Sequence, residues 1–386
     1  MSLSIPSLRD TLKLLSSTNR LVALVVDLFG LDAFDVAEEI GVAPYIFSIS
    51  TATSFLFWFH MPKLDKMFTC EYRDLPEPVK LPGCVPVHGR DLFEAVLDRS
   101  HVEYRKLLEN VSRVASYEGI IINSFLDLEE GAIKALQMEE PCKPPVYPIG
   151  PLIQTGTSDG SESSDQPECL KWLDDQPSQS VLFVSFGSAG TLSLDQINEL
   201  ALGLEMSGQK FLWVARSPSD KSDAAFFDAQ SQTDPLGFLP NGFLERTKGQ
   251  GLVVSSWAPQ IEVLRHGSIG GFLTQCGWNS TLESVFYGVP LIARPLFGEQ
   301  MMTAVMLNEG LNVALRPKAN EVGIVEREEI ARVVKELMKG EEGEKVRGKI
   351  KGLQDAAGKA VNKDGSSAKS LSELAVRWKN YKNISV

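Results

Sequence analysis

The chain has 386 residues, of which 43% are hydrophobic and 23% charged, as in a soluble globular protein long enough for two domains. Its 50 acidic and 38 basic side chains give a formal net charge of −12. This charge argues against nucleic acid or an anionic membrane as a partner, although backbone amides and helix ends can still bind an anionic small molecule.

The first half of the chain alternates predicted strands and helices. Residues 21–30, LVALVVDLFG, form an apolar run typical of a strand buried on both faces of a parallel sheet. Residues 33–41 have helical spacing, and strands are predicted at 43–50 and 117–125. The apolar residues 45–61 predict a buried strand and a buried helix rather than a membrane span, because they are polar in the middle and short.

The second half repeats the order strand, loop and helix, which predicts right-handed βαβ units and an open parallel sheet. A polar stretch rich in Ser, Asp and Gly separates it from the first half. We therefore expect a first domain of residues 1–150, a linker of 151–179, a second domain of 180–365 and a C-terminal helix of 366–386 that returns to the first domain. Open parallel sheets bind ligands outside the carboxyl ends of their strands.

One such strand end lies in residues 270–284, GGFLTQCGWNSTLES. Gly277 lets the chain turn, and Asn279 and Ser280 stand where N-cap residues are expected. The free amides and the dipole of a helix start favour phosphate. Glu283, one turn later, can accept two hydrogen bonds from a diol.

Two tryptophans and a second loop extend this pattern. Trp257 and Trp278 offer flat apolar faces at two strand ends. Residues 185–191, SFGSAGT, form a glycine-containing loop that could approach the same phosphates, although it matches neither GxGxxG nor a Walker loop. Together these features indicate a nucleotide. A nicotinamide-dependent oxidoreductase is the alternative from the α/β pattern alone, and the missing GxGxxG disfavours it.

Residues 257–300 resemble the signature box of plant secondary-product glycosyltransferases, which use UDP-sugars. Residues 23–42, 81–87, 238–247 and 314–343 resemble the branch that glucosylates small phenols. The resemblance implies the GT-B fold, in which two Rossmann-like domains face a cleft. It also implies UDP-glucose as the donor, a small phenolic acceptor such as a phenylpropanoid, inversion at the anomeric carbon, and neither a cofactor nor a metal.

The resemblance assigns a role to each matching position. Four groups of residues are expected to bind the UDP-sugar. Trp257 and the backbone of Ala258 bind uracil, and Gln260 and Glu283 bind ribose. The diphosphate is bound by Gln275, Asn279, Ser280 and Ser188, and the sugar by Trp278, Glu299 and Gln300. A final Gln in the box goes with glucose more often than with galactose. Thr51 is expected to touch the sugar from the first domain.

In the family, a histidine near the N-terminus removes the acceptor proton, and an aspartate orients that histidine. Asp27 matches the aspartate, but residues 1–26 contain no histidine, and none of the chain's four histidines matches the missing one. We therefore expect an incomplete first domain, an unpaired apolar edge along the Asp27 strand, and impaired transfer. The alternative is a non-catalytic fragment that binds UDP-sugar.

Gln275 stands where the family has a histidine. Its amide can donate two hydrogen bonds but is neutral, and charge-assisted hydrogen bonds are about twice as strong as neutral ones. We expect donor binding to be weaker by about 1–2 kcal/mol for this reason.

The five cysteines are widely spaced and include no CxxC pair, which disfavours a disulfide framework or a zinc site. The N-terminal residues lack the order of a signal peptide. These features lead us to expect a cytoplasmic monomer without a membrane span.

Overall fold

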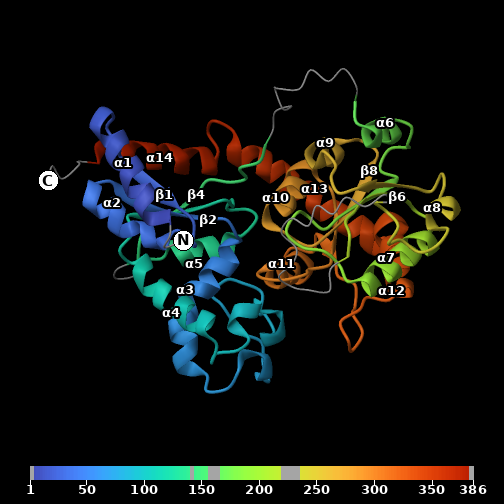
Figure 1. Ribbon diagram of the computed structural model, residues 1–386, viewed down its shortest axis with the longest axis horizontal. Helices are drawn as coiled ribbons and strands as arrows, with labels where there is room; N and C mark the ends of the chain where they lie inside the picture. Colours follow the sequence, from blue (N-terminus) through green and yellow to red (C-terminus); the bar gives the residue numbers. More distant parts are fainter. Residues whose placement is uncertain (1–3, 140–142, 155–165, 219–234, 382–386) are drawn as a thin grey trace. The chain divides into compact units, whose positions relative to one another are not determined.

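The computed structural model describes residues 4–139, 143–154, 166–218 and 235–381. The chain folds into two compact units (Figure 1): unit 1 is Met1–Leu152 with Ala356–Val386, and unit 2 is Ile153–Asp355. Each unit has one parallel β-sheet with helices packed against it, which confirms the predicted α/β class. Most of the polar stretch predicted as a linker lies outside the described residues, as do the last residues of the predicted C-terminal helix.

Unit 1 contains a four-stranded sheet in the order β1-β2-β3-β4. Its strands are β1 (Ala23–Val26), β2 (Ala43–Ser48), β3 (Gly119–Ile122) and β4 (Val146–Pro148). Its α-helices are α1 (Ile5–Thr18), α2 (Phe34–Ile40), α3 (Ala52–Met67), α4 (Val102–Val114), α5 (Glu130–Gln137) and α14 (Ser366–Asn380). Four 3₁₀ turns are Leu31–Ala33, Tyr72–Asp74, Gly89–Asp91 and Glu94–Val96. Strand β2 followed by the largely buried helix α3 confirms the prediction for residues 45–61.

Strand β1 lies at one end of this sheet, and within the described residues it pairs only with β2. The prediction that its apolar run is buried on both faces is wrong, because Val25 is 41% exposed and the other three residues are half-buried. The expected apolar edge is therefore present in the described part of the chain. Such an edge is a template for unwanted strand pairing.

Helix α14 covers one face of the sheet of unit 1. Leu374 is fully buried in a cluster with residues of β2, β3 and β4, and the rings of Trp378 and Tyr45 meet edge to face with centroids 5.6 Å apart. Ser367 at the start of the helix donates from Oγ to the carbonyl of Gly150. The C-terminal helix is therefore part of the core of unit 1.

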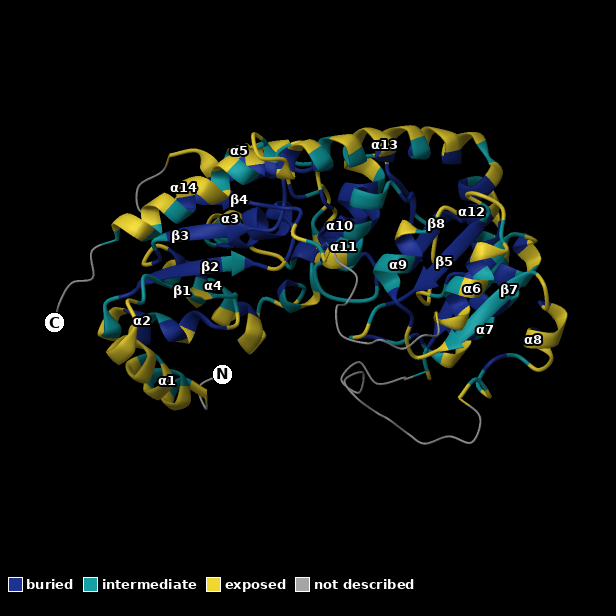
Figure 2. Ribbon diagram, turned by 90° about the horizontal axis from the view of Figure 1, so that it is seen from above, coloured by how far each residue is buried: buried dark blue, intermediate teal, exposed yellow. Residues whose placement is uncertain are grey.

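Unit 2 contains a six-stranded parallel sheet in the order β10-β9-β8-β5-β6-β7. Its strands are β5 (Val181–Ser185), β6 (Lys210–Ala215), β7 (Gly251–Ser255), β8 (Ile269–Thr274), β9 (Leu291–Ala293) and β10 (Ala314–Leu315). Its helices are α6 (Glu168–Asp174), α7 (Leu194–Ser207), α8 (Phe243–Arg246), α9 (Gln260–Arg265), α10 (Trp278–Tyr287), α11 (Gln300–Val305), the π-helical turn Met306–Gly310, α12 (Arg327–Lys339) and α13 (Glu341–Val361), whose last residues belong to unit 1. The predicted alternation of strands and helices is confirmed. Figure 2 shows the inner strands of each sheet, such as β2, β3, β5 and β8, largely buried and the outer helical surfaces exposed.

The strand order of unit 2 reverses beside β5. The chain runs from β5 through β6 to β7 on one side and then continues with β8, β9 and β10 on the other. Ser185 at the end of β5 is in register with Thr274 at the end of β8, so the loops after both strands begin at the same level. Such a switch point in an open parallel sheet creates a crevice outside the carboxyl ends of the strands, where ligands bind.

Candidate functional site

Helix α10 starts at this switch point. It begins at Trp278 with Gly277 as N-cap, and its first intrahelical bond runs from Thr281 N to Gly277 O at 2.9 Å. The prediction that Asn279 and Ser280 are N-cap residues is therefore wrong: both lie in the first helical turn, because the extended backbone of Gly277 makes the turn earlier. The amide groups of this first turn have no acceptor within the helix.

Gln275 lies between the two loops of the switch point. Thr274 Oγ1 donates to Gln275 Oε1 at 3.1 Å, which orients the amide. A Cβ atom built on Gly187 would lie 2.2 Å from Gln275 Nε2, and one built on Gly277 would lie 3.1 Å from it. The donor nitrogen of Gln275 therefore sits where the loop after β5 meets the start of α10.

The residue after Gln275 holds the turn in an unusual conformation. Cys276 has a φ of 66°, in the left-handed region that residues other than glycine rarely adopt. Such residues cost on the order of 1–3 kcal/mol and concentrate at ligand sites. Burial raises the pKa of the Cys276 thiol to about 12, so the thiol is a buried filler and not a nucleophile.

Helices α9 and α10 bring three predicted residues together. Gln260 Nε2 donates to Ser280 Oγ at 2.9 Å and to Glu283 Oε2 at 2.6 Å. Burial raises the pKa of the half-buried Glu283 carboxyl, and the hydrogen bond from Gln260 offsets part of this shift. The two residues expected to hold a ribose diol are thus adjacent, with a carboxylate oxygen and an amide available for two hydroxyl groups.

The two predicted flat surfaces differ. Trp257 follows Ser256, which has a φ of 67°, and its side chain is 72% exposed. Ala258 beside it is buried. Trp278 is only 4% exposed, so the prediction that it offers an open face is wrong.

The loop after β9 carries the last residues of the signature box. Gln300 is the first residue of α11, and its Oε1 accepts from Leu296 N at 3.0 Å and from Phe297 N at 3.2 Å. The carbonyl of this side chain thus fixes its own loop, and the remaining Nε2 group can only donate. Glu299 is the half-buried N-cap residue of α11.

The loop after β5 carries Ser188, which is exposed. Arg216, directly after β6, donates from Nη1 to the carbonyls of Gly187 at 3.1 Å, Ser188 at 2.7 Å and Gly190 at 3.0 Å. Arg216 could not be identified from the sequence, because its partners lie 26 to 29 residues away along the chain.

The two predicted residues of unit 1 cap their own local structure. Asp27 Oδ1 accepts from Phe29 N at 2.9 Å and from Gly30 N at 3.0 Å, which closes a turn after β1. Thr51 is the N-cap of α3: its Oγ1 accepts from Ser54 N at 2.9 Å and contacts Ser54 Oγ at 2.7 Å. Among the hydrogen bonds of the described residues, none joins Asp27 to a histidine.

A buried carboxylate that sequence reasoning missed holds the start of α3. Glu129 accepts from Ala52 N, Thr53 N and Thr53 Oγ1, each at 2.9 Å, and from Ser124 Oγ at 2.8 Å. Burial raises the pKa of Glu129, and these four donors lower it in part. Glu129 thereby ties the loop after β2 to the residues that follow β3.

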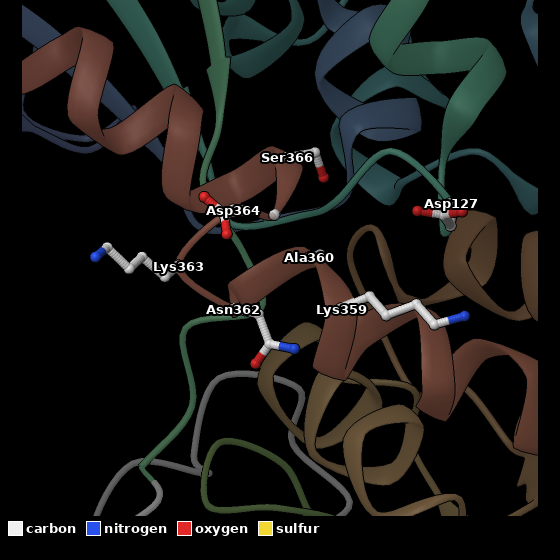
Figure 3. Close-up of a pocket in the computed structure, with 8 residues that line it drawn as sticks. Asp127, Lys359, Ala360, Asn362, Lys363, Asp364 and Ser366 are labelled. Atoms are coloured by element: carbon white, nitrogen blue, oxygen red, sulfur yellow. The ribbon is translucent and has the colours of Figure 1, made fainter.

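An open hollow of about 730 Å³ in unit 1 is separate from these residues. It lies at the turn between α13 and α14 and is lined by Asp127, Lys359, Lys363, Asp364 and Ser366, among others. Figure 3 shows the two lysine side chains extending to opposite sides, so their charges do not converge. The described residues contain no group of three or more side chains suited to a metal ion, and no helix among them is long and apolar enough to cross a membrane.

Two α/β units with parallel sheets, one of which brings Gln260, Ser280 and Glu283 together beside its switch point, have the architecture of the GT-B class of glycosyltransferases. Residues 152–345 match the family model described as "UDP-glucoronosyl and UDP-glucosyl transferase", and the chain belongs to this family. The resemblance inferred from residues 257–300 is thereby confirmed.

Relatives and solved structures agree with this assignment. Hydroquinone glucosyltransferase of Rauvolfia serpentina is 60% identical over 378 residues, which cover 98% of this chain and 80% of that protein. UGT2 of Phytolacca americana, solved with UDP-2fluoro-glucose and pterostilbene, has a TM-score of 0.89 at 55% identity and covers 98% of this chain and 81% of its own. A UDP-glucosyltransferase of Polygonum tinctorium capable of glucosylating indoxyl, in complex with 3,4-dichloroaniline, has a TM-score of 0.90 at 53% identity, with 98% and 80% covered.

Proposed function

We propose that this protein transfers glucose from UDP-glucose to a hydroxyl group of a small phenol, with inversion at the anomeric carbon. The observation that carries the proposal is the cluster of Gln260, Ser280 and Glu283 at the starts of α9 and α10, with the exposed ring of Trp257 three residues before Gln260 in the sequence. The names of the relatives, a hydroquinone glucosyltransferase and an indoxyl-glucosylating enzyme, support an aromatic hydroxyl compound as acceptor.

The donor is held by unit 2. Trp257 stacks on the uracil, and the backbone of Ala258 contacts the edge of that base. Glu283 and Gln260 take the two ribose hydroxyls. The diphosphate binds to the first-turn amides of α10, to Asn279 and Ser280, to Gln275 Nε2 and to Ser188. A base stacked on an aromatic side chain is worth about 1–3 kcal/mol, and hydrogen bonds to charged groups are worth about 1.5–3 kcal/mol each.

The glucose lies near the loop after β9. Gln300 Nε2 donates to a sugar hydroxyl, because its Oε1 is taken by Leu296 N and Phe297 N. Glu299 accepts from the neighbouring hydroxyls. Gln300 in this position favours glucose over galactose.

The acceptor binds to unit 1, and its oxygen attacks the anomeric carbon as the bond to the diphosphate breaks. UDP leaves with the electron pair, and the acceptor proton passes to a base. Asp27 supports that base in the proposed mechanism, but residues 1–26 contain no histidine to play the part. General-base catalysis typically contributes 10²–10⁴-fold, so transfer without such a base is slow, and the neutral Gln275 weakens donor binding.

This sequence feature also favours a second candidate function, a UDP-sugar-binding protein without transferase activity. We further propose that the protein acts in the cytoplasm as a monomer.

The two functions are separated by incubating the 386-residue chain with UDP-glucose and hydroquinone and following the glucoside and UDP by mass spectrometry. The proposed transferase yields a β-glucoside and UDP in equal amounts, slowly but above a Glu283→Ala control. UDP binding without any glucoside would favour the binding protein, and the absence of UDP binding would contradict both.

A further inference from the structure

The guanidinium group of Arg216 meets three carbonyl oxygens of one short loop. Nη1 donates to the carbonyls of Gly187, Ser188 and Gly190 at 2.7 to 3.1 Å. Arg216 is half-buried at the carboxyl end of β6, next to β5 in the sheet. The side chain that follows the neighbouring strand β6 thus binds three of the four carbonyls of residues 187–190 in the loop after β5.

The three bonds determine which way this loop faces. Because the carbonyl oxygens turn toward Arg216, the amide groups of the same peptides turn away from it. Gly187 has a φ of 68°, in the left-handed region, and a turn that includes such a residue can direct successive amides into a concavity that binds anions.

The loop after β5 lies close to the start of α10. Gln275 Nε2 lies close to both Gly187 and Gly277, the N-cap of α10, so Gln275 links the loop to that helix. The loop and the first turn of α10 are therefore two walls of the same crevice at the switch point. A group between them meets backbone amides from both sides.

We propose that Arg216 is a positioning residue for the diphosphate of the donor: it holds the loop Gly187–Gly190 so that the loop amides and Ser188 meet the phosphates. The proposal rests on the proposed function, in which UDP binds at this crevice. Arg216 itself points to the carbonyl side of the loop and does not touch the phosphates, and its positive charge behind the loop adds to the attraction for an anion.

The test compares two arginines of unit 2. Arg216→Met removes the three bonds and keeps the apolar stem. Arg246→Met is the matched control, since Arg246 also makes three hydrogen bonds, to Glu205 and to the Asn241 carbonyl, on the exposed helix α8. The affinities for UDP and for uridine are measured by NMR titration of the full chain, because uridine lacks the phosphates and does not reach the loop.

Arg216→Met is expected to lower the affinity for UDP at least tenfold and to leave the affinity for uridine within twofold of that of the unchanged chain. Arg246→Met is expected to leave both affinities unchanged. UDP binding within twofold of the unchanged chain would overturn the proposal. An equal loss for UDP and uridine would also overturn it, because that result indicates a general structural role. If the unchanged chain binds no UDP, the proposed function itself fails.

A second variant covers the case in which Arg216→Met does not fold. Arg216→Lys keeps a cation, but its shorter side chain cannot reach all three carbonyls. This variant is expected to lower the affinity for UDP at least threefold and to leave the affinity for uridine unchanged. Equal affinities of Arg216→Lys and the unchanged chain for UDP would contradict the positioning role.

Discussion

Gln260 Nε2 donates a hydrogen bond of 2.6 Å to Glu283 Oε2, although the two residues belong to different helices of unit 2. The bond leaves Glu283 Oε1 and Gln260 Oε1 as acceptors for two neighbouring hydroxyl groups. In the proposed function this pair is oriented for a ribose diol before the ligand arrives, which lowers the entropic cost of binding.

Replacing Glu283 by Ala should weaken UDP by about 1.5–3 kcal/mol, since hydrogen bonds to a charged acceptor are lost. Calorimetric titration of UDP measures the change. Glu245→Ala is the control, because Glu245 is an exposed carboxylate of unit 2 on helix α8. Equal UDP affinities of the two variants would count against the diol assignment.

The raised pKa of Glu283 gives uridine binding a pH dependence. Only the ionised carboxylate has an acceptor oxygen free for a ribose hydroxyl while it also accepts from Gln260, so affinity should fall with decreasing pH and begin to fall above the usual titration range of glutamate. Uridine is the probe because the terminal phosphate of UDP itself titrates at about pH 6. Glu283→Gln should remove this pH dependence, and an unchanged profile in that variant would refute the assignment.

The raised pKa of Glu283 also affects the stability of the fold, which should decrease with rising pH, whereas the affinity for uridine should increase. Because the folded-state pKa is raised, the folded protein binds the Glu283 proton more readily than the unfolded chain does. The contribution is therefore present below the ordinary glutamate pKa and is lost as the pH rises through the raised value. Urea unfolding at several pH values measures this effect. The free energy of unfolding should fall more steeply with rising pH in the unchanged chain than in Glu283→Gln.

Gln275→His should strengthen UDP binding by about 1–2 kcal/mol, because an imidazolium at this place adds charge to the donors around the diphosphate. The gain should be larger at pH 6 than at pH 8, since an unperturbed histidine has a pKa of about 6.5. Titrations at the two pH values check both statements. Equal affinity of the two chains at pH 6 would contradict the diphosphate assignment of Gln275.

Trp257→Ala should cost about 1–3 kcal/mol in UDP affinity, the usual contribution of one base stacked on an aromatic ring. Because the ring is 72% exposed, the variant should keep the melting temperature of the unchanged chain. Calorimetry for binding and circular dichroism for melting separate the two effects. A large loss of stability with intact binding would assign Trp257 to packing.

Glu129→Ala should destabilise unit 1 by about 2–4 kcal/mol, because four donors at the start of α3 lose a buried acceptor. The neighbouring Glu130 is exposed and pairs only with Lys134 in the next turn, so Glu130→Ala should leave stability unchanged. Hydrogen exchange of the α3 amides measures both variants. Equal protection in the two would show that the Glu129 network contributes little.

Most strands and helices of the fold could be predicted from the sequence, because apolar runs and helical spacing are local signals. The burial of β1 was mispredicted for a long-range reason: the apolar run of Val25 and its neighbours does not reveal whether a second strand pairs with its outer edge. Helix α1 gave no clear signal, and it buries no residue.

The residues expected to bind the UDP-sugar could be named from the sequence because the signature box is long and its residues occur in a fixed order. Their local geometry could not be predicted in this way. The N-cap of α10 is Gly277 instead of Asn279 or Ser280, a difference of two or three residues that depends on the φ and ψ of one turn. Arg216 and Glu129 bind backbone groups that are far away in the sequence, and no short sequence pattern predicts such contacts.

A crystal structure of the 386-residue chain with UDP tests the central claim most directly. The account predicts uracil against Trp257, the ribose hydroxyls on Glu283 and Gln260, and the diphosphate between the first turn of α10 and the loop Gly187–Gly190. UDP bound at another place, or no UDP at millimolar concentration in crystals with an ordered unit 2, would contradict it.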